Sequence, residues 1–461
     1  MAGIILSVDI GTSSLKAAFI DLDGKLLAFS RQAYQRGANG SPDAAAWELA
    51  FIRALEDIHA QAPQRAPDGI CVSGNGPTLA PLTKDGETLP PLYWHDGRKI
   101  VLTENSSPRA PSHSPRSFFL PHAAWLKENA PAEYEKTSFF LSPHEWLSHR
   151  LGSGAFAVLP STAYEPYFWD DQQCRLFDLD RKKFPPFVKM GSVMGNLSPA
   201  AAAFFAPACG NRLKSGTPII AGGTDFITAL VGTATLKPAD VCDRAGSSEG
   251  INVCAAIPVE KSGLRVLPHV KEGLWNIGKL IPSSGRLFEW YRSFSGQEDI
   301  SYETLLARLI PSSGDTSIFQ RVDFLPLAGN AFPPSLSPGS RSPLDLGRAV
   351  LCAIAFAVRD AAEVLGACGF PVKEMKVSGG QAKNARWNQL KADITGIRLM
   401  IPDIPDGELA GNAVLAATAL GAAPGFEEAA DKMIRAWDVY EPRPGAASFW
   451  NERYSLYKTA K

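Results

Sequence analysis

The 461-residue sequence lacks any run of about 18 apolar residues, the length that a helix needs to cross a bilayer. It begins without a basic segment, and its first apolar run is interrupted by Asp9, so we expect no secretory signal. The formal net charge is only −1, which gives no electrostatic reason to expect a nucleic acid or a membrane as partner. These absences favour a cytoplasmic protein that acts on a small molecule.

Cysteine and histidine are also scarce, with seven of each. The cysteines are scattered and never form a C-x-x-C pair, which argues against a disulfide framework or a structural zinc site. His144 and His149 share one segment, but a spacing of five residues is poor for two ligands on one helical face. We therefore expect a reducing compartment and no metal bound by histidine.

Strands and helices are predicted in both halves of the chain, which indicates an α/β architecture. At roughly 100–200 residues per domain, the length predicts two or more domains. The predicted strands are 4–10, 15–20, 26–29 and 68–74, the predicted helices are 43–61, 346–365 and 408–420, and strand–loop–helix units are predicted at 217–234 and 374–396.

Two turns rich in glycine and hydroxyl residues, Gly11–Ser14 and Gly246–Ser248, each join two predicted strands. Such turns present N–H groups and hydroxyls to phosphate oxygens, and glycine lets a ligand approach the backbone. Neither turn is a Walker A loop, because G-x-x-x-x-G-K-[ST] is absent and a strand follows where a helix should. The alternative for both is an ordinary hairpin turn. Their shared plan of strand, turn and strand indicates two related half-structures.

Two carboxylates lie beside these candidate ligand-binding segments. Asp9 lies near the end of the first strand, where it would repel phosphate unless a cation intervened. Because Mg²⁺ prefers carboxylate and water ligands and bridges to phosphates, Asp9 is a candidate magnesium ligand; the alternative is a strand-end turn residue. Asp225 follows "IIAGGT" and begins a helix, so it is either a helix cap or a base that faces a substrate hydroxyl during phosphoryl transfer.

Five segments, taken in order, resemble those of the FGGY carbohydrate kinases, and the xylulokinase-like members most, along nearly the whole chain. They are similar to the family's first phosphate motif, sugar loop, catalytic-aspartate segment, second phosphate motif and adenosine motif. In this sequence the five read VDIGTSSLKAAFIDLDG, ICVSGNGPTLAPLTKDGETLPPLYWHDGR, GTPIIAGGTDFITALVGTATLKPADV, AGSSEG and VSGGQAKNARWNQLKADITGIRLMIP.

The resemblance implies an actin-like ATPase fold, with two ribonuclease-H-like domains and a central cleft. Residues 1–228 would be the sugar-binding domain and residues 229–461 the nucleotide-binding domain. ATP and Mg²⁺ would be the cofactors, a primary hydroxyl of a small sugar or polyol would be phosphorylated, and a homodimer is compatible with the family. The matching residues are Asp225 as catalytic base and substrate contact, Asp9 at the metal, Gly11, Thr12, Ser13, Gly246 and Ser247 at the phosphates, Gly379, Gly380 and Asn384 at the adenosine, and Asn75, Gly76 and Asp96 at the sugar.

Two segments depart from the family's pattern. Xylulokinases have Gln-Met-His-Gly where this chain has Asn75–Thr78, so Pro77 replaces an imidazole donor, and Glu249 stands where a small residue is common. Hydrogen bonds to hydroxyls discriminate strongly between sugars. These changes therefore argue against D-xylulose as the substrate more than they argue against kinase activity. The alternatives are a kinase for ribulose, glycerol or a modified sugar, a catalytically weak sugar-binding or regulatory protein, or an actin-like ATPase with a protein partner.

Overall fold

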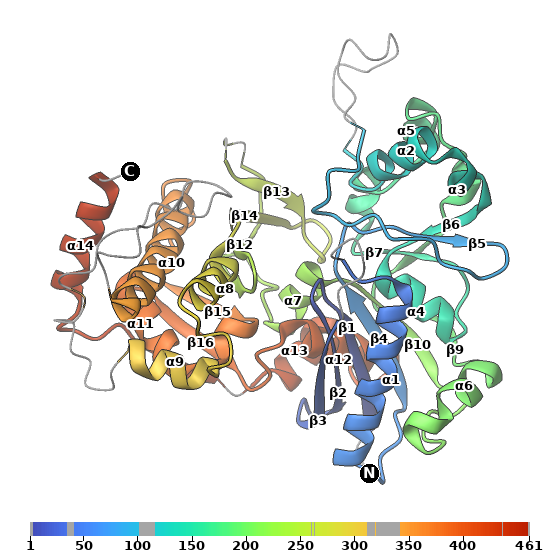
Figure 1. Cartoon of the computed structure of the whole chain (residues 1–461), viewed down its shortest axis with the longest axis horizontal. Coiled ribbons are helices and arrows are strands. Elements are labelled where there is room, and N and C mark those ends of the chain that lie inside the picture. The colour runs from blue at the N-terminus through green and yellow to red at the C-terminus, as the bar shows by residue number, and fades with distance from the viewer. Residues whose placement is uncertain are drawn as a thin grey trace. The chain divides into compact units, whose positions relative to one another are not determined.

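The chain forms two compact units, shown in the computed structural model of Figure 1. The structure describes residues 3–34, 41–100, 116–259, 261, 263–310, 319, 342–435 and 437–459. Unit 1 consists of Met1–Ala234, Pro268–Glu272 and Gly407–Ile434, and unit 2 of Thr235–Leu267, Gly273–Asp406 and Arg435–Lys461.

Unit 1 is built on a six-stranded sheet with the order β3-β2-β1-β4-β10-β9. The first three strands form an antiparallel meander, and β4 and β10 extend the sheet parallel to β1. All residues of β1 are buried, as is usual for a strand that is covered on both faces. The strands are β1 (Ile4–Ile10), β2 (Ser14–Asp21), β3 (Leu26–Ala33), β4 (Gly69–Gly74), β9 (Val193–Asn196) and β10 (Pro218–Thr224), with two small sheets of β5 (Ala80–Thr83) and β6 (Thr137–Leu141) and of β7 (Ala157–Leu159) and β8 (Phe187–Lys189).

Helices of unit 1 cover this sheet, and the helix predicted over 43–61 is confirmed as α1. Asp43 caps it by accepting a hydrogen bond from the N–H of Ala46 at 2.8 Å. Its apolar residues recur at helical spacing and are buried in the unit 1 core. The helices are α1 (Ala44–Gln61), α2 (Leu120–Asn129), α3 (Pro131–Lys136), α4 (Pro143–Leu151), α5 (Asp171–Leu176), α6 (Pro199–Cys209), α7 (Asp225–Gly232), α12 (Gly407–Ala419) and α13 (Phe426–Met433).

Helix α12 packs on α7 with almost no side chain between the two backbones. A Cβ atom on Gly411 would lie 2.0 Å from the carbonyl oxygen of Thr228, and one on Gly232 would lie 1.8 Å from that of Gly407. Only glycine permits such a close approach. The contact assigns α12 to unit 1, so the compact units do not follow the single division after residue 228 that the sequence suggests.

Unit 2 repeats the plan of the first sheet, in the order β13-β14-β12-β11-β15-β16-β17. Strands β11, β12 and β14 are antiparallel neighbours, and β15 and β16 extend the sheet parallel to β11. The two glycine-rich turns thus occupy equivalent places, as their similar sequences predict. The strands are β11 (Val241–Ala245), β12 (Glu249–Ala255), β13 (Arg265–Pro268), β14 (Trp275–Ile281), β15 (Glu374–Ser378), β16 (Arg398–Pro402) and β17 (Trp437–Tyr440).

The helices of unit 2 bury a core rich in aromatic side chains, in which Phe356 of α10 packs against Trp450 and Tyr457 of α14. The helix predicted over 346–365 is confirmed as α10 of this unit, and the helix predicted over 408–420 is confirmed as α12 of unit 1, each within a few residues. The elements are α8 (Ser284–Phe294), α9 (Tyr302–Leu309), α10 (Pro343–Gly366), the short 3₁₀ helix η4 (Gly380–Lys383), α11 (Ala385–Thr395) and α14 (Ala447–Thr459).

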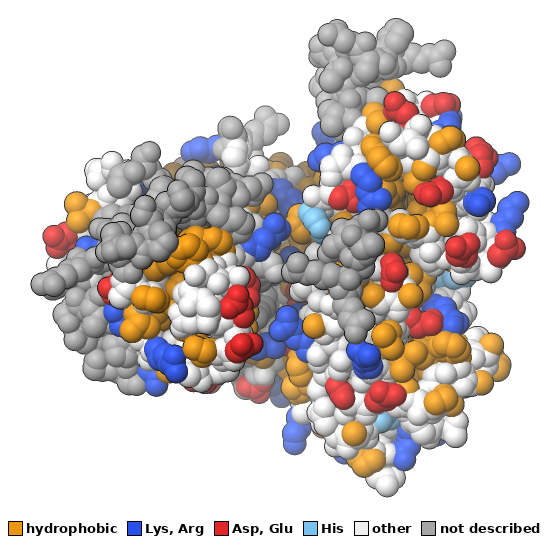
Figure 2. Space-filling view, in the orientation of Figure 1, with side chains coloured by type: hydrophobic (Ala, Val, Ile, Leu, Met, Phe, Trp, Pro, Cys, Tyr) orange, Lys and Arg blue, Asp and Glu red, His pale blue; other side chains and the backbone are white. Residues whose placement is uncertain are grey.

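The described surface carries charges of both signs. Figure 2 shows Lys and Arg interspersed with Asp and Glu over the visible face. Within the residues that the structure describes, no helix has the length and hydropathy of a membrane span.

The buried imidazole of His144 leads to a pH-dependent prediction. Neither ring nitrogen has a hydrogen-bond partner among the described residues, and burial lowers the pKa of His144 from 6.5 to about 3. The stability that depends on the neutral ring is therefore complete above pH 6.5 and is lost as the pH falls toward 3. Between pH 7 and 5, the unfolding free energy of the wild type should fall by about 2 kcal/mol relative to His144→Leu.

Denaturant unfolding at several pH values measures this difference. Parallel pH profiles of His144→Leu and the wild type would contradict a neutral buried imidazole.

Candidate active site

Three neighbouring parallel strands of unit 1 end at one edge of the sheet and carry polar residues there. Asp9 on β1 is paired in register with Ser73 on β4, and Ser73 is paired with Gly223 on β10. Asp225 follows β10 directly as the first residue of α7. Ligands of open α/β sheets bind at the carboxyl ends of such strands. The structure therefore brings Asp9 and Asp225 to the same edge.

Asp9 is buried in a locally acidic environment. Its Oδ1 accepts a hydrogen bond from the Ser73 hydroxyl at 2.9 Å. Burial raises the pKa of Asp9 to about 7, and the carboxylates of Glu408 and Asp225 act in the same direction, while Lys16 opposes them. The Nζ of Lys16 lies 3.7 Å from Oε2 of Glu408. A cation placed among these carboxylates would relieve their mutual repulsion.

The donors at this edge suit Mg²⁺ rather than a metal enclosed entirely by protein. Within the described residues, no group of three or more His, Cys, Asp or Glu side chains is arranged to hold a metal ion by itself. Mg²⁺ usually keeps several waters and takes one or two carboxylates together with substrate phosphates. Asp9 with Asp225 nearby supplies that donor chemistry.

Asp225 is positioned at the start of α7. Its Oδ1 accepts a hydrogen bond from the N–H of Phe226 at 2.7 Å. The N-cap residue is Thr224, so Asp225 occupies the first helical position. A carboxylate at this position can accept a proton when it is ionised.

The predicted first phosphate loop is the tight turn between β1 and β2. The N–H of Gly11 donates to the carbonyl oxygen of Ser14 at 3.1 Å, and a Cβ on Gly11 would lie 2.9 Å from that oxygen. Thr12 Oγ1 accepts a hydrogen bond from Trp94 Nε1 at 3.4 Å, and Ser13 is exposed. The turn thus presents hydroxyls beside the strand end that carries Asp9.

The sugar-loop segment is tied to this turn by Asn75. Its buried amide donates to the carbonyl oxygen of Ile10 at 3.0 Å and accepts a hydrogen bond from the Thr78 hydroxyl at 2.7 Å. A Cβ on Gly76 would lie 2.8 Å from Cγ2 of Thr224, the residue before the predicted base. Asn75 and Gly76 therefore lie close to both the first phosphate loop and the start of α7.

Asp96 forms a turn in the same segment. Its Oδ2 accepts hydrogen bonds from the N–H of Tyr93 at 2.9 Å and from Arg98 Nη2 at 2.7 Å, and its Oδ1 accepts one from the N–H of Arg98 at 2.9 Å. Trp94 and His95, between these partners, are exposed. The structure shows a turn-forming role for Asp96, and its contact with a sugar stays a prediction.

The predicted nucleotide segments of unit 2 adjoin one another. Gly246 and Ser247 form the turn between β11 and β12. Gly379 has a φ of +98°, and a Cβ there would lie 2.5 Å from the carbonyl oxygen of Ala245, so only glycine fits. A Cβ on Gly380 would meet no atom within 4 Å, which leaves open space where a base or ribose was expected.

Asn384 lies one step further along the adenosine segment. It is the N-cap of α11, and its Oδ1 accepts a hydrogen bond from the N–H of Trp387 at 3.0 Å. Its Nδ2 donates to Oε2 of Glu303 at 2.7 Å. These bonds use the amide within the protein, and its contact with a nucleotide stays a prediction.

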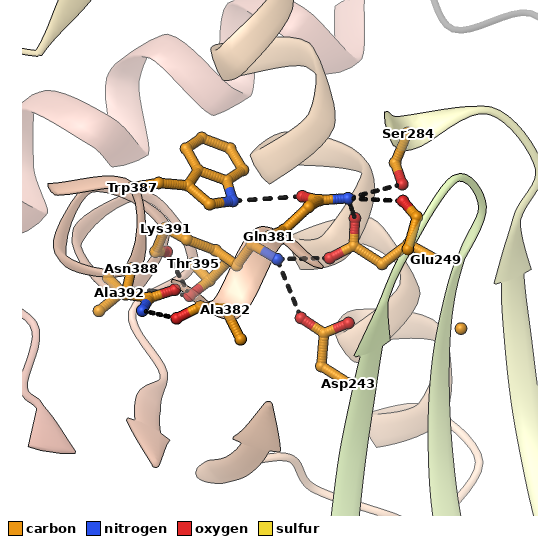
Figure 3. A network of polar contacts seen from close by, with 12 residues as sticks. Asp243, Glu249, Ser284, Gln381, Ala382, Trp387, Asn388, Lys391, Ala392 and Thr395 are labelled. Carbon is orange, nitrogen blue, oxygen red and sulfur yellow. Dashed lines mark hydrogen bonds and ion pairs between the residues drawn. The ribbon is translucent and has the colours of Figure 1, made fainter. Parts of the chain in front are cut away.

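Glu249 does not project from the second phosphate loop. Its side chain is fully buried and forms an ion pair with Lys391, which lies 3.0 Å from Oδ2 of Asp243 (Figure 3). Sequence reasoning noticed Glu249 but missed Lys391 as its partner. The signal was present, because Lys391 follows Trp387 by four residues and so lies on the same buried helix face.

Family models match most of the chain. The model of the N-terminal domain of the FGGY family of carbohydrate kinases matches residues 4–232, and that of the C-terminal domain matches residues 244–420.

Curated relatives of similar length extend this match. A xylulose kinase of Bacillus subtilis (strain 168) is 24% identical over 489 residues, covering 98% of this chain and 96% of its own. An autoinducer-2 kinase of Escherichia coli (strain K12) is also 24% identical, covering 99% and 92%. The crystal structure of a "xyloylose kinase" from Brucella ovis is similar in fold, with a TM-score of 0.78 at 21% identity, covering 99% and 98% of the two chains. The predicted two-domain fold is thereby confirmed.

Proposed function

Because this chain belongs to the FGGY family of carbohydrate kinases, which are ATP-dependent phosphotransferases, we propose that it phosphorylates a primary hydroxyl of a small sugar or polyol. The observation that carries the proposal is the placement of Asp9 and Asp225 at the same edge of the sheet, at the ends of the two parallel strands that flank β4, beside the Gly11–Ser13 turn. That arrangement suits phosphoryl transfer, which depends on positioning and charge neutralisation more than on covalent chemistry.

Each residue has a distinct task in this mechanism. Asp225 accepts the proton of the sugar hydroxyl. The oxygen of that hydroxyl forms a bond to the terminal phosphorus of ATP, while the bond between this phosphorus and the oxygen of the leaving ADP breaks. Asp9 would hold Mg²⁺, which when bound neutralises phosphate charge. The turns at Gly11–Ser13 and at Gly246 and Ser247 bind phosphate oxygens through N–H groups and hydroxyls.

The two units divide the substrates in this proposal. Unit 1 carries the sugar loop and the base, and unit 2 carries the adenosine segment with Gly379, Gly380 and Asn384. We further propose a cytoplasmic enzyme that works as a homodimer; both are family-level expectations.

Several sugars are candidate substrates. The relatives named xylulose kinase and autoinducer-2 kinase are equally similar to this chain, at 24% identity. The sugar loop also has Pro77 in place of the imidazole donor of xylulokinases. D-Xylulose, which would connect the enzyme to xylose metabolism, is therefore tested beside ribulose, glycerol and modified sugars.

ADP release in the presence of MgATP, measured across a panel of ketoses, aldoses, polyols and autoinducer-2, tests the function. We expect release that depends on one class of sugar, and a product whose primary hydroxyl carries phosphate by ³¹P-coupled NMR. ATP binding without any sugar-dependent release across the panel would favour a sugar-binding or regulatory protein on the same scaffold.

A further inference from the structure

Two buried carboxylates stand at the base of the second phosphate loop. Glu249 is the first residue of β12, directly after Gly246–Ser248, and it is paired in register with Ala245 at the end of β11. Asp243 lies two residues before Ala245, so its side chain points to the same face of the strand. Both side chains are fully buried. Without a compensating cation, the carboxylates of Asp243 and Glu249 would place negative charge directly beneath a loop that is proposed to bind anions.

Lys391 of α11 reaches between these two carboxylates, as Figure 3 shows. Its ammonium group forms ion pairs with Glu249 and with Asp243 and is itself fully buried. Burial disfavours the charge on Lys391, but the two carboxylates outweigh burial and hold its pKa above the ordinary lysine value. Burial, and then the charge of Glu249, raise the pKa of Asp243. Lys391 thus compensates the negative charge of the two buried carboxylates.

The loop itself is held from the adenosine segment and from α8. Gln381 Nε2 donates to the carbonyl oxygen of Gly246 at 3.1 Å and to the hydroxyl of Ser284 at 3.1 Å. The N–H of Arg286 donates to the carbonyl oxygen of Ser247 at 3.1 Å. These bonds direct two loop carbonyls, which would repel phosphate, toward donors inside unit 2.

Gln381 also connects the loop to the cluster. Its Nε2 lies 3.5 Å from Oε2 of Glu249, and its Oε1 accepts a hydrogen bond from Trp387 Nε1 at 3.2 Å. Trp387 and Lys391 lie one turn apart on α11. Gln381 therefore contacts the loop at Gly246 and also contacts Glu249 and Trp387, which are neighbours of Lys391.

We propose that Lys391 is a positioning residue for the second phosphate loop: it fixes Glu249 and Asp243 on the two strands that hold Gly246–Ser248, and it cancels the charge of Glu249 beside the nucleotide's phosphates. The inference rests on the proposed function, because it assigns Lys391 to the binding of ATP. Without Lys391, an uncompensated carboxylate would repel the phosphates, and Glu249 would lose its ion pair with α11.

Calorimetric titration with ATP and with adenosine tests the proposal, because adenosine lacks the phosphates that the loop binds. Lys391→Met should weaken ATP binding roughly tenfold or more and should change adenosine binding by less than about threefold. The double variant Lys391→Met/Glu249→Gln removes both charges together, so it should return ATP binding to within about threefold of the wild type. The matched control is Lys376→Met, which removes a lysine of β15 that is ion-paired with Asp240 at 3.0 Å.

Three results would overturn the role of Lys391: unchanged ATP binding in Lys391→Met, an equal loss for ATP and adenosine, or no recovery in the double variant. If Lys391→Met does not fold, Lys391→Gln, which also removes the charge but keeps a polar side chain, takes its place in the same comparison with the double variant. A wild-type protein that binds no ATP would overturn the proposed function and this inference together, whereas normal wild-type binding with an unaffected Lys391→Met would overturn this inference alone.

Discussion

Replacement of Asp225 by asparagine should lower kcat by about 10³-fold with the preferred sugar, because the variant loses its general base. Asparagine keeps the size of the side chain and can still accept the hydrogen bond from the N–H of Phe226, so α7 should start as before. Nucleotide binding should remain nearly intact, since the base is needed for the chemical step. Coupled ADP release measures kcat, and calorimetry measures the affinity for MgATP.

Asp171→Asn is the matched control for this prediction. Asp171 is also the first residue of a helix in unit 1, α5, but its side chain is largely exposed to solvent. The control should turn over at the wild-type rate. Near-normal turnover in Asp225→Asn would contradict its assignment as the base, and a loss of ATP affinity equal to the loss of kcat would indicate a binding role instead.

Asp9→Asn should reduce kcat/KM for MgATP by about 10²-fold and should raise the Mg²⁺ concentration needed for half-maximal activity. The amide oxygen can still accept the hydrogen bond from Ser73, so the local structure should persist. Because the change removes a buried charge that lies near Glu408 and Asp225, the free energy of unfolding should stay the same or increase. Activity titrations with Mg²⁺ at fixed ATP, together with denaturant unfolding, measure both effects.

A loss of activity with MgATP, together with an unchanged or increased free energy of unfolding, distinguishes a metal site from a structural carboxylate. Asp68→Asn provides the comparison, because Asp68 lies at the opposite end of the same strands and accepts a hydrogen bond from the N–H of Ile4 at 2.7 Å. That variant should respond to Mg²⁺ as the wild type does. An unchanged Mg²⁺ dependence in Asp9→Asn would count against its role at the metal.

Local sequence signals predicted the elements that carry the site. Glycine and hydroxyl residues between apolar strands predicted both turns. The capping box that Ser142 and Glu145 form at the start of α4 is a local signal of the same kind. These signals work because turn and cap conformations depend on residues close together in the chain.

Long-range partners could not be predicted in this way. Asp9 is flanked by Ser73, and Glu408 adds its charge from a helix some four hundred residues further along the chain. Asn412 of the same helix donates to the carbonyl oxygen of Val8 at 2.9 Å. No periodicity or motif relates these positions, since their proximity arises only when α12 packs against unit 1.

The sequence by itself determined the α/β class, the two similar turns, the likeness to a kinase family and the candidate residues Asp9 and Asp225. Each depends on residue type and local spacing, which the chain carries whatever its tertiary fold. Only the tertiary structure decided what surrounds those residues. It showed that Asn75, Asp96 and Asn384 use their polar atoms within the protein, that Glu249 is buried, and that α12 joins unit 1. Burial and charge compensation depend on contacts between distant segments, such as that of Lys391 with β11 and β12, and such contacts exist only in the folded chain.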